Sequence, residues 1–234
     1  MAGWTRWFGL GVIAVGLLAG DQIRLKRPDH KYRLTVEIET PDGMKSASGV
    51  IAVHPNRSYA GTGSTGTQIK GDALVVDAGK GKGVVVLLAH GGAPLDLEAI
   101  NYIDLRAINA ATGQRVQFRE LKSLSASAPV TEGRTPVLLA FADMANPASA
   151  RVVRPDEFET SLGGGIRLKA MTVETLPPGW WPIDFGGALG EPVTRQIDGK
   201  LPWWRDAETA AARALQSAML SLPDGTPAIK VFRR

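Results

Sequence analysis

One stretch of the chain, Gly61–Gly66, matches the cofactor-binding pattern G-x-G-x-x-G. A dinucleotide site needs this pattern directly between a strand and a helix, so that the amides at the start of the helix hold the pyrophosphate. Residues 67–71 are instead strand-like, and no Lys-Ser or Lys-Thr pair follows, as a phosphate loop requires. We therefore interpret residues 55–67 as a loop rich in glycine, serine and threonine rather than as a nucleotide site.

Residues 88–92, Leu-Ala-His-Gly-Gly, follow an apolar run and are similar to the oxyanion loop of α/β-hydrolases. That fold also needs a nucleophile elbow, G-x-S-x-G, further along the chain. Ser64 lies upstream of His90, and the string around Ser161 lacks the first glycine. The sequence therefore gives no support to a hydrolase of this type.

The sequence gives little support to metal binding and none to thiol chemistry. The chain has no cysteine, which excludes disulfides, thiolate zinc sites, iron–sulfur clusters and cysteine nucleophiles. It has three histidines, His30, His54 and His90, and none lies two or four residues from another, so no local pair of metal ligands forms. Asp96, Glu98 and Asp104 could face a cation, but we interpret them as a solvated acidic face. We predict no catalytic residue, no cofactor and no metal.

Four of the six tryptophans form two adjacent pairs among prolines, Trp180-Trp181 and Trp203-Trp204. In irregular chain, neither a helix stripe nor a strand face can organise them into one small core. Tryptophan is enriched at interface hot spots and at the surface of membranes. We predict that Trp180, Trp181, Trp203 and Trp204 contact a partner; anchoring beside the bilayer, or closing one end of a sheet, are the alternatives.

Residues 1–23 are predicted to be a retained membrane anchor. The uncharged run Trp7–Gly20 spans about 21 Å as a helix, and extending it over Ala2–Ile23, with Arg6 snorkelling, just crosses the bilayer. A cleaved signal and a buried core helix are the alternatives, although no good cleavage site follows the run. The predicted anchor residues are Trp4, Trp7, Phe8, Leu10, Val12, Ile13, Leu17 and Leu18.

Charge is concentrated at the two ends of the chain. The formal net charge is +4, but residues 21–33 and the last five residues are both basic, which leaves the body slightly acidic. Nucleic-acid binders carry their basic residues on the folded face, so we exclude that class. Residues 24–31 form a basic juxtamembrane linker. The positive-inside rule favours a cytoplasmic body, whereas a short tail followed by one helix favours a periplasmic one; we predict a periplasmic body.

The strands and helices that must position these residues are predicted to be short. Alternation of apolar and polar residues predicts a strand over 32–39, with a turn at Pro41–Gly43. Unbroken apolar runs predict central strands at 73–76 and 84–88, joined by a glycine-rich turn. Further strands are expected at 49–53, 137–141 and 166–174, and helices at 94–110, 155–162 and 206–220. The predicted fold is α+β, a mainly antiparallel or mixed β-sheet with one or two packed helices (32–178), between an N-terminal transmembrane helix and a Trp/Pro-rich extension with one helix (179–234).

Several stretches are similar to those of a known family: residues 32–43, 71–77, 154–156 with 165–168, and 191–194 with 201–203. On these stretches the chain resembles a family of uncharacterised proteobacterial envelope proteins with an N-terminal membrane or lipoprotein segment. The resemblance implies an envelope location and transfers no catalytic residue.

Together these observations predict a membrane-anchored, non-enzymatic interaction module, an accessory subunit of a bacterial inner-membrane complex. Its expected partners are the inner membrane and a membrane protein, and not nucleic acid. Two alternatives remain open. One is an envelope structural domain. The other is an enzyme with a site near the loops 55–67 and 90–96, since paired carboxylates can assemble across a fold without a local signature.

Overall fold

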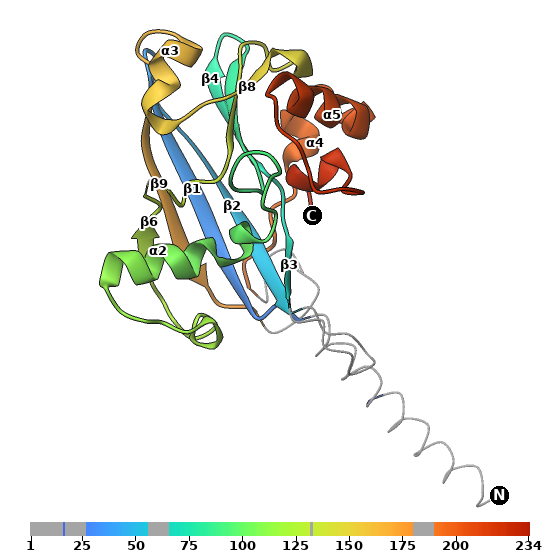
Figure 1. Ribbon diagram of the computed structural model, residues 1–234. Coiled ribbons are helices and arrows are strands. Elements are labelled where there is room, and N and C mark those ends of the chain that lie inside the picture. Colours follow the sequence, from blue (N-terminus) through green and yellow to red (C-terminus); the bar gives the residue numbers. More distant parts are fainter. Residues whose placement is uncertain (1–15, 17–26, 56–65, 132, 180–189) are drawn as a thin grey trace, which may run out of the picture.

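The computed structural model describes residues 16, 27–55, 66–131, 133–179 and 190–234, and its architecture is α+β, as predicted (Figure 1). Within these residues no helix is long and apolar enough to cross a bilayer. The predicted anchor, including every one of its named residues from Trp4 to Leu18, lies outside the described ranges.

The larger of two sheets has five antiparallel strands in the order β3-β2-β1-β9-β6. Its strands are β1 (His30–Thr40), β2 (Gly43–Pro55), β3 (Thr67–Lys70), β6 (Ser127–Pro129) and β9 (Arg167–Leu176). In β1 the predicted alternation is confirmed, because Tyr32, Leu34, Val36 and Ile38 are all buried on one face. The strand begins two residues earlier than predicted, inside the segment assigned as a linker.

A tight hairpin joins β1 to β2, as the Pro41–Gly43 turn signal predicts. Thr40 and Gly43 face each other across a two-residue loop, and the Thr40 hydroxyl donates to the Gly43 carbonyl at 2.7 Å. Gly43 has φ of 106°, which a residue with a side chain rarely adopts. The hairpin fixes the register of the whole β1–β2 ladder.

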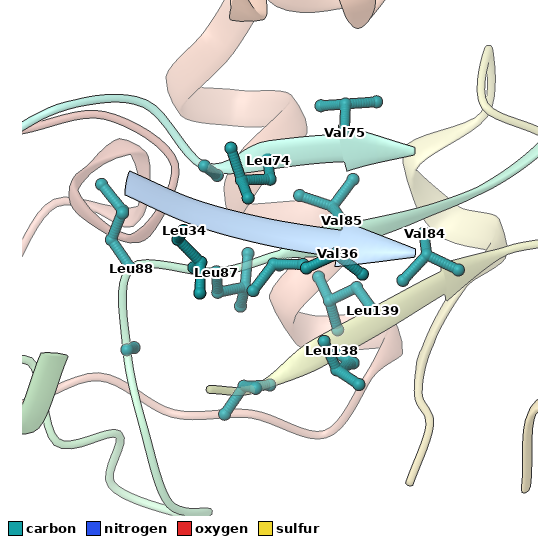
Figure 2. Close-up of a cluster of buried hydrophobic side chains, with 14 of the residues drawn as sticks. Leu34, Val36, Leu74, Val75, Val84, Val85, Leu87, Leu88, Leu138 and Leu139 are labelled. Carbon is teal, nitrogen blue, oxygen red and sulfur yellow. The ribbon is translucent and has the colours of Figure 1, made fainter. Parts of the chain in front are cut away.

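The smaller sheet has four antiparallel strands in the order β4-β5-β7-β8. They are β4 (Leu74–Gly79), β5 (Lys82–Val86), β7 (Leu138–Phe141) and β8 (Ala150–Val152). The prediction that both apolar runs form central strands is wrong for β4, which lies at the edge. Its side chains are buried because this sheet packs face to face with the larger one. Figure 2 shows Leu34 and Val36 of β1 beside the leucines and valines of the smaller sheet.

One helix, α2 (Ile103–Thr112), crosses the inner face of the larger sheet beside β6 and β9 (Figure 1). The 3-10 turn η1 (Ala99–Tyr102) precedes it, and Gly113 ends it in the left-handed region, as predicted. The predicted helical start at residue 94 is wrong. The amide of Leu95 donates to the Ser221 carbonyl, and Asp96 exchanges backbone hydrogen bonds with His90. In this segment, hydrogen bonds to residues outside it therefore replace those of a helix.

The remaining elements are short. They are α3 (Phe158–Leu162), α4 (Ile197–Lys200), α5 (Ala207–Ser217), η2 (Phe118–Glu120), η3 (Pro147–Ser149), η4 (Pro155–Glu157), η5 (Trp204–Asp206) and η6 (Ala228–Val231). The C-terminal segment belongs to the same core as the sheets, because Val231 and Phe232 are fully buried. Ala73 donates to the Phe232 carbonyl and Leu88 to that of Val231, so this segment is bonded to the smaller sheet.

Candidate functional site

A groove of about 350 Å³ lies where the edges of the two sheets meet. One wall is the first half of β2, the second is β4, and the third is the segment that leads into α4. Its lining consists of Lys45, Ser46, Ala47, Ser48, Ala73, Leu74, Val75, Asp77, Thr194, Gln196, Ile197 and Lys200.

The edge of β2 is open along this groove. Farther along, β3 pairs with β2 from Ala52 to Pro55, and Thr194 covers Val50 by donating its amide to the Val50 carbonyl and accepting the Val50 amide at its hydroxyl. Within the part of the chain that the structure describes, no strand pairs with β2 between Met44 and Ser48 on the side away from β1. The backbone groups that face this way are therefore available to another chain.

Asp72 holds the third wall in place. It is 1 % exposed, and its carboxylate accepts hydrogen bonds from the Ile197 amide at 3.1 Å and from the Arg195 guanidinium at 3.0 Å. Arg233 adds a bidentate pair at 2.7 and 2.8 Å. Burial by itself would raise the pKa of Asp72, but the bonds from Arg233, Ile197 and Arg195 outweigh it and lower that pKa below its ordinary value.

Arg233 connects the same wall to the tryptophan pair. Its guanidinium lies 5.0 Å from the ring centroid of Trp204 and 2.8 Å from the Asp198 carboxylate. The hydrogen bond to Asp72 is the largest cause of the raised pKa of Arg233, so this side chain stays charged at any pH at which the fold persists. Asp72 and Arg233 thus tie the C-terminal segment, α4 and β4 together behind the groove.

The groove is mainly polar and has cationic rims. Ala47 is partly exposed on its floor and Leu74 and Ile197 are buried beneath it, whereas Lys45 and Lys200 stand on opposite walls. Neither lysine forms an ion pair with any residue in the described ranges, and Asp77 is the one acidic side chain in the lining. The arrangement suits an extended chain that carries a carboxylate.

The structure places Trp203 and Trp204 next to the core, and both are partly buried. Trp203 contacts Phe232 edge-to-face, with ring centroids 5.6 Å apart, and lies 6.4 Å from Phe141. Its indole Nε1 is buried and has no hydrogen-bond partner among the described residues. Trp180 and Trp181 lie outside the described residues. Partner contact by these tryptophans stays a prediction.

The loops considered for catalysis are only partly described, because residues 56–65 lie outside the described ranges. The strand expected after Gly66 is confirmed as β3, so no helix start follows the glycine pattern. In the other loop the Asp96 carboxylate accepts the amides of Glu98 and Ala99, at 2.8 and 3.0 Å. One carboxylate oxygen of this exposed side chain therefore holds the backbone that leads into η1.

A buried pair, His30 and Asp104, was missed by the reasoning from sequence. Both side chains are fully buried, with His30 Nε2 2.9 Å from Asp104 Oδ2 but without the alignment of a hydrogen bond. The ring of Phe118 packs edge-on against His30, at 5.0 Å between centroids. The interpretation of Asp104 as part of a solvated face is thus wrong. One signal existed, since its position falls within the apolar stripe of the helix, beside Ile103 and Ala107.

Tyr32 is a neighbour of this pair in the core. Its hydroxyl donates to the Ile100 carbonyl at 2.9 Å. Burial, and next the negative charge of Asp104, raise the pKa of Tyr32 well above its ordinary value. Burial lowers the pKa of Arg234 to about 10, and its guanidinium donates to the carbonyls of Leu88 and Leu97. The side chains of Tyr32 and Arg234 thus donate hydrogen bonds to backbone carbonyls inside the fold and stabilise it.

No family model, no curated protein and no solved structure matches this chain.

Proposed function

We propose that this protein is a membrane-anchored, non-enzymatic interaction module, an accessory subunit of a bacterial inner-membrane complex with its body in the periplasm. The observation that carries the proposal is the groove beside the open edge of β2. Among the described residues, it offers strand backbone that pairs with no other strand and two lysines without ionic partners, which are parts of a peptide-recognition surface.

The groove shares a segment with the expected contact region, residues 180–204, although its lining includes neither Trp203 nor Trp204. The described residues 190–204 supply the third wall through Thr194, Ile197 and Lys200. Hydrogen bonds of Asp72 to the Ile197 amide and to Arg233 hold this wall against β4, so bonds within the chain itself fix the surface. A preformed surface loses less conformational entropy on binding.

Site-specific photo-crosslinking in native membranes tests the proposal. A photoreactive amino acid is placed at Ser48 or Gln196 in the groove, and at Lys122, which is exposed and does not line the groove, as the matched control. We expect one discrete crosslinked membrane protein from both groove positions and none from Lys122. An envelope structural domain, the alternative, predicts no discrete product from any position.

The membrane anchor has its own test. The full chain is expected to stay in the membrane pellet after a carbonate wash and to begin near Met1. Recovery of a soluble form that starts after residue 20 would contradict the anchor.

A further inference from the structure

We infer that the groove binds its partner by β-strand addition: an extended, acidic segment of another protein pairs with Met44–Ser48 of β2. The inference rests on the proposed function and specifies the chemistry of the partner. Two observations carry it, namely the direction of the β2 backbone groups and the two lysines.

The first observation is the alternation of hydrogen bonds along β2. In an antiparallel hairpin, every second residue turns its N–H and C=O toward the partner strand and the others turn away. Val50 turns away from β1, because Thr194 takes up both of its backbone groups. By the same alternation Met44, Ser46 and Ser48 also present their N–H and C=O outward. This free stretch is about 17 Å long and matches a segment of roughly five residues.

The second observation is charge. Lys45 is the cross-strand partner of Ile38, so its side chain leaves β2 on the inner face, toward the groove. Lys200 approaches from the opposite wall, and Asp77 offsets only one of the two charges. An added strand directs alternate side chains into the same space, where a carboxylate would lie between the two ammonium groups.

The charge of Lys45 also distinguishes a second copy of this chain from an acidic segment of another protein. A second copy of this chain, paired edge to edge through Met44–Ser48, would bring another Lys45 beside the first and gain no carboxylate. Like charges at neighbouring cross-strand positions destabilise a sheet. An acidic segment of a different protein is therefore the occupant that the groove favours, with small apolar residues beside Ala47 and Leu74.

A competing role for Lys45 is protection of the open edge, which natural sheets often assign to lysine. A lysine that only protects the edge disfavours every added strand, because the strand would bury its charge. A recognition lysine instead favours a strand that carries a carboxylate.

The test uses the full chain in mild detergent and a fluorescent nine-residue peptide of alternating threonine and valine with a central glutamate. We expect saturable binding, with affinity reduced at least about 10-fold by Ser46→Pro and unchanged by Ser46→Ala, since proline removes one outward donor. Lys45→Glu should weaken binding by about 5- to 10-fold. The same peptide with alternate amides N-methylated, or with lysine at its centre, should bind at least about 10-fold more weakly.

Two outcomes would overturn the inference. The first is no saturable binding of the glutamate peptide, or binding that Ser46→Pro does not change. The second is self-association of the chain that Ser46→Pro abolishes, which would assign the edge to a second copy.

The crosslinking experiment separates this inference from the proposed function. If the probe at position 196 captures a membrane protein equally well in Ser46→Pro and Ser46→Ala, the interaction module stands and strand addition fails. If the peptide binds as expected but no membrane protein is captured, strand addition stands and the accessory-subunit proposal fails.

Discussion

Among single residues, Asp72 has the clearest energetic role. Four hydrogen bonds converge on its carboxylate from two arginines and one backbone amide. We expect Asp72→Asn to lower the free energy of unfolding by about 3 kcal/mol at pH 7, because it removes the buried carboxylate on which the two partly exposed arginines and the Ile197 amide converge. The exposed partner of Arg233 is the control, since Asp198→Asn should cost less than about 1 kcal/mol.

The same substitution has a predictable pH dependence. The pKa of Asp72 is lower in the folded protein than its ordinary value, so the native state holds fewer protons than the unfolded chain between the two pKa values. The stabilisation is complete above about pH 4 and is lost as the pH falls through the folded-state pKa. Urea unfolding at several pH values should therefore show the parent and Asp72→Asn converging in acid. A gap that persists at low pH would contradict this.

Trp203 gives a second test at the residue scale. Because it packs against Phe141 and Phe232, Trp203→Ala should lower stability by about 3 kcal/mol. Trp204 carries the Arg233 guanidinium on its face, and Trp204→Ala should cost about 1 kcal/mol. Thermal melts check both values. A Trp203→Ala variant that melts with the parent but loses its membrane partner would assign this residue to contact alone.

The elements show which features were predictable. The hairpin of β1 and β2 follows from alternation and a turn signal, both local properties of the sequence. The edge position of β4 does not, because a face-to-face sheet buries an edge strand as fully as a central one. The groove was equally unpredictable, since its walls come from residues 45–48, 73–77 and 194–200. Only the tertiary fold brings these segments together.

The register of the β1–β2 hairpin predicts different effects of proline at two neighbouring positions of β2. Ser46→Pro should change the free energy of unfolding by less than about 1 kcal/mol, because the Ser46 amide faces away from β1. Ala47→Pro, one residue farther, removes a bond to β1 and should cost about 3 kcal/mol or more. Urea unfolding of the two variants measures the difference. Equal losses would show that the assignment of outward and inward amides is wrong.

For the whole molecule, the N-terminal limit of the folded body can be placed from β1. His30 is fully buried against Asp104, and the Asp29 amide donates to the Val53 carbonyl. A chain of residues 27–234 is expected to melt in one transition. A chain of residues 32–234 should be less stable by about 3 kcal/mol, because the buried Asp104 loses its partner. Calorimetry of both truncations tests the limit, and equal melting temperatures would contradict a structural role for His30.

The pairing of the C-terminal segment with Gly71 and Asp72 has a consequence for biosynthesis. The Arg233–Asp72 bond joins residues 161 positions apart, and the Arg33–Glu174 pair joins β1 to β9 across 141 positions. The larger sheet cannot be completed until β9 has been synthesised, and Asp72 gains its Arg233 partner later still. The local β1–β2 hairpin can form early, but the tertiary structure around Asp72 is therefore among the last parts of the fold to be completed.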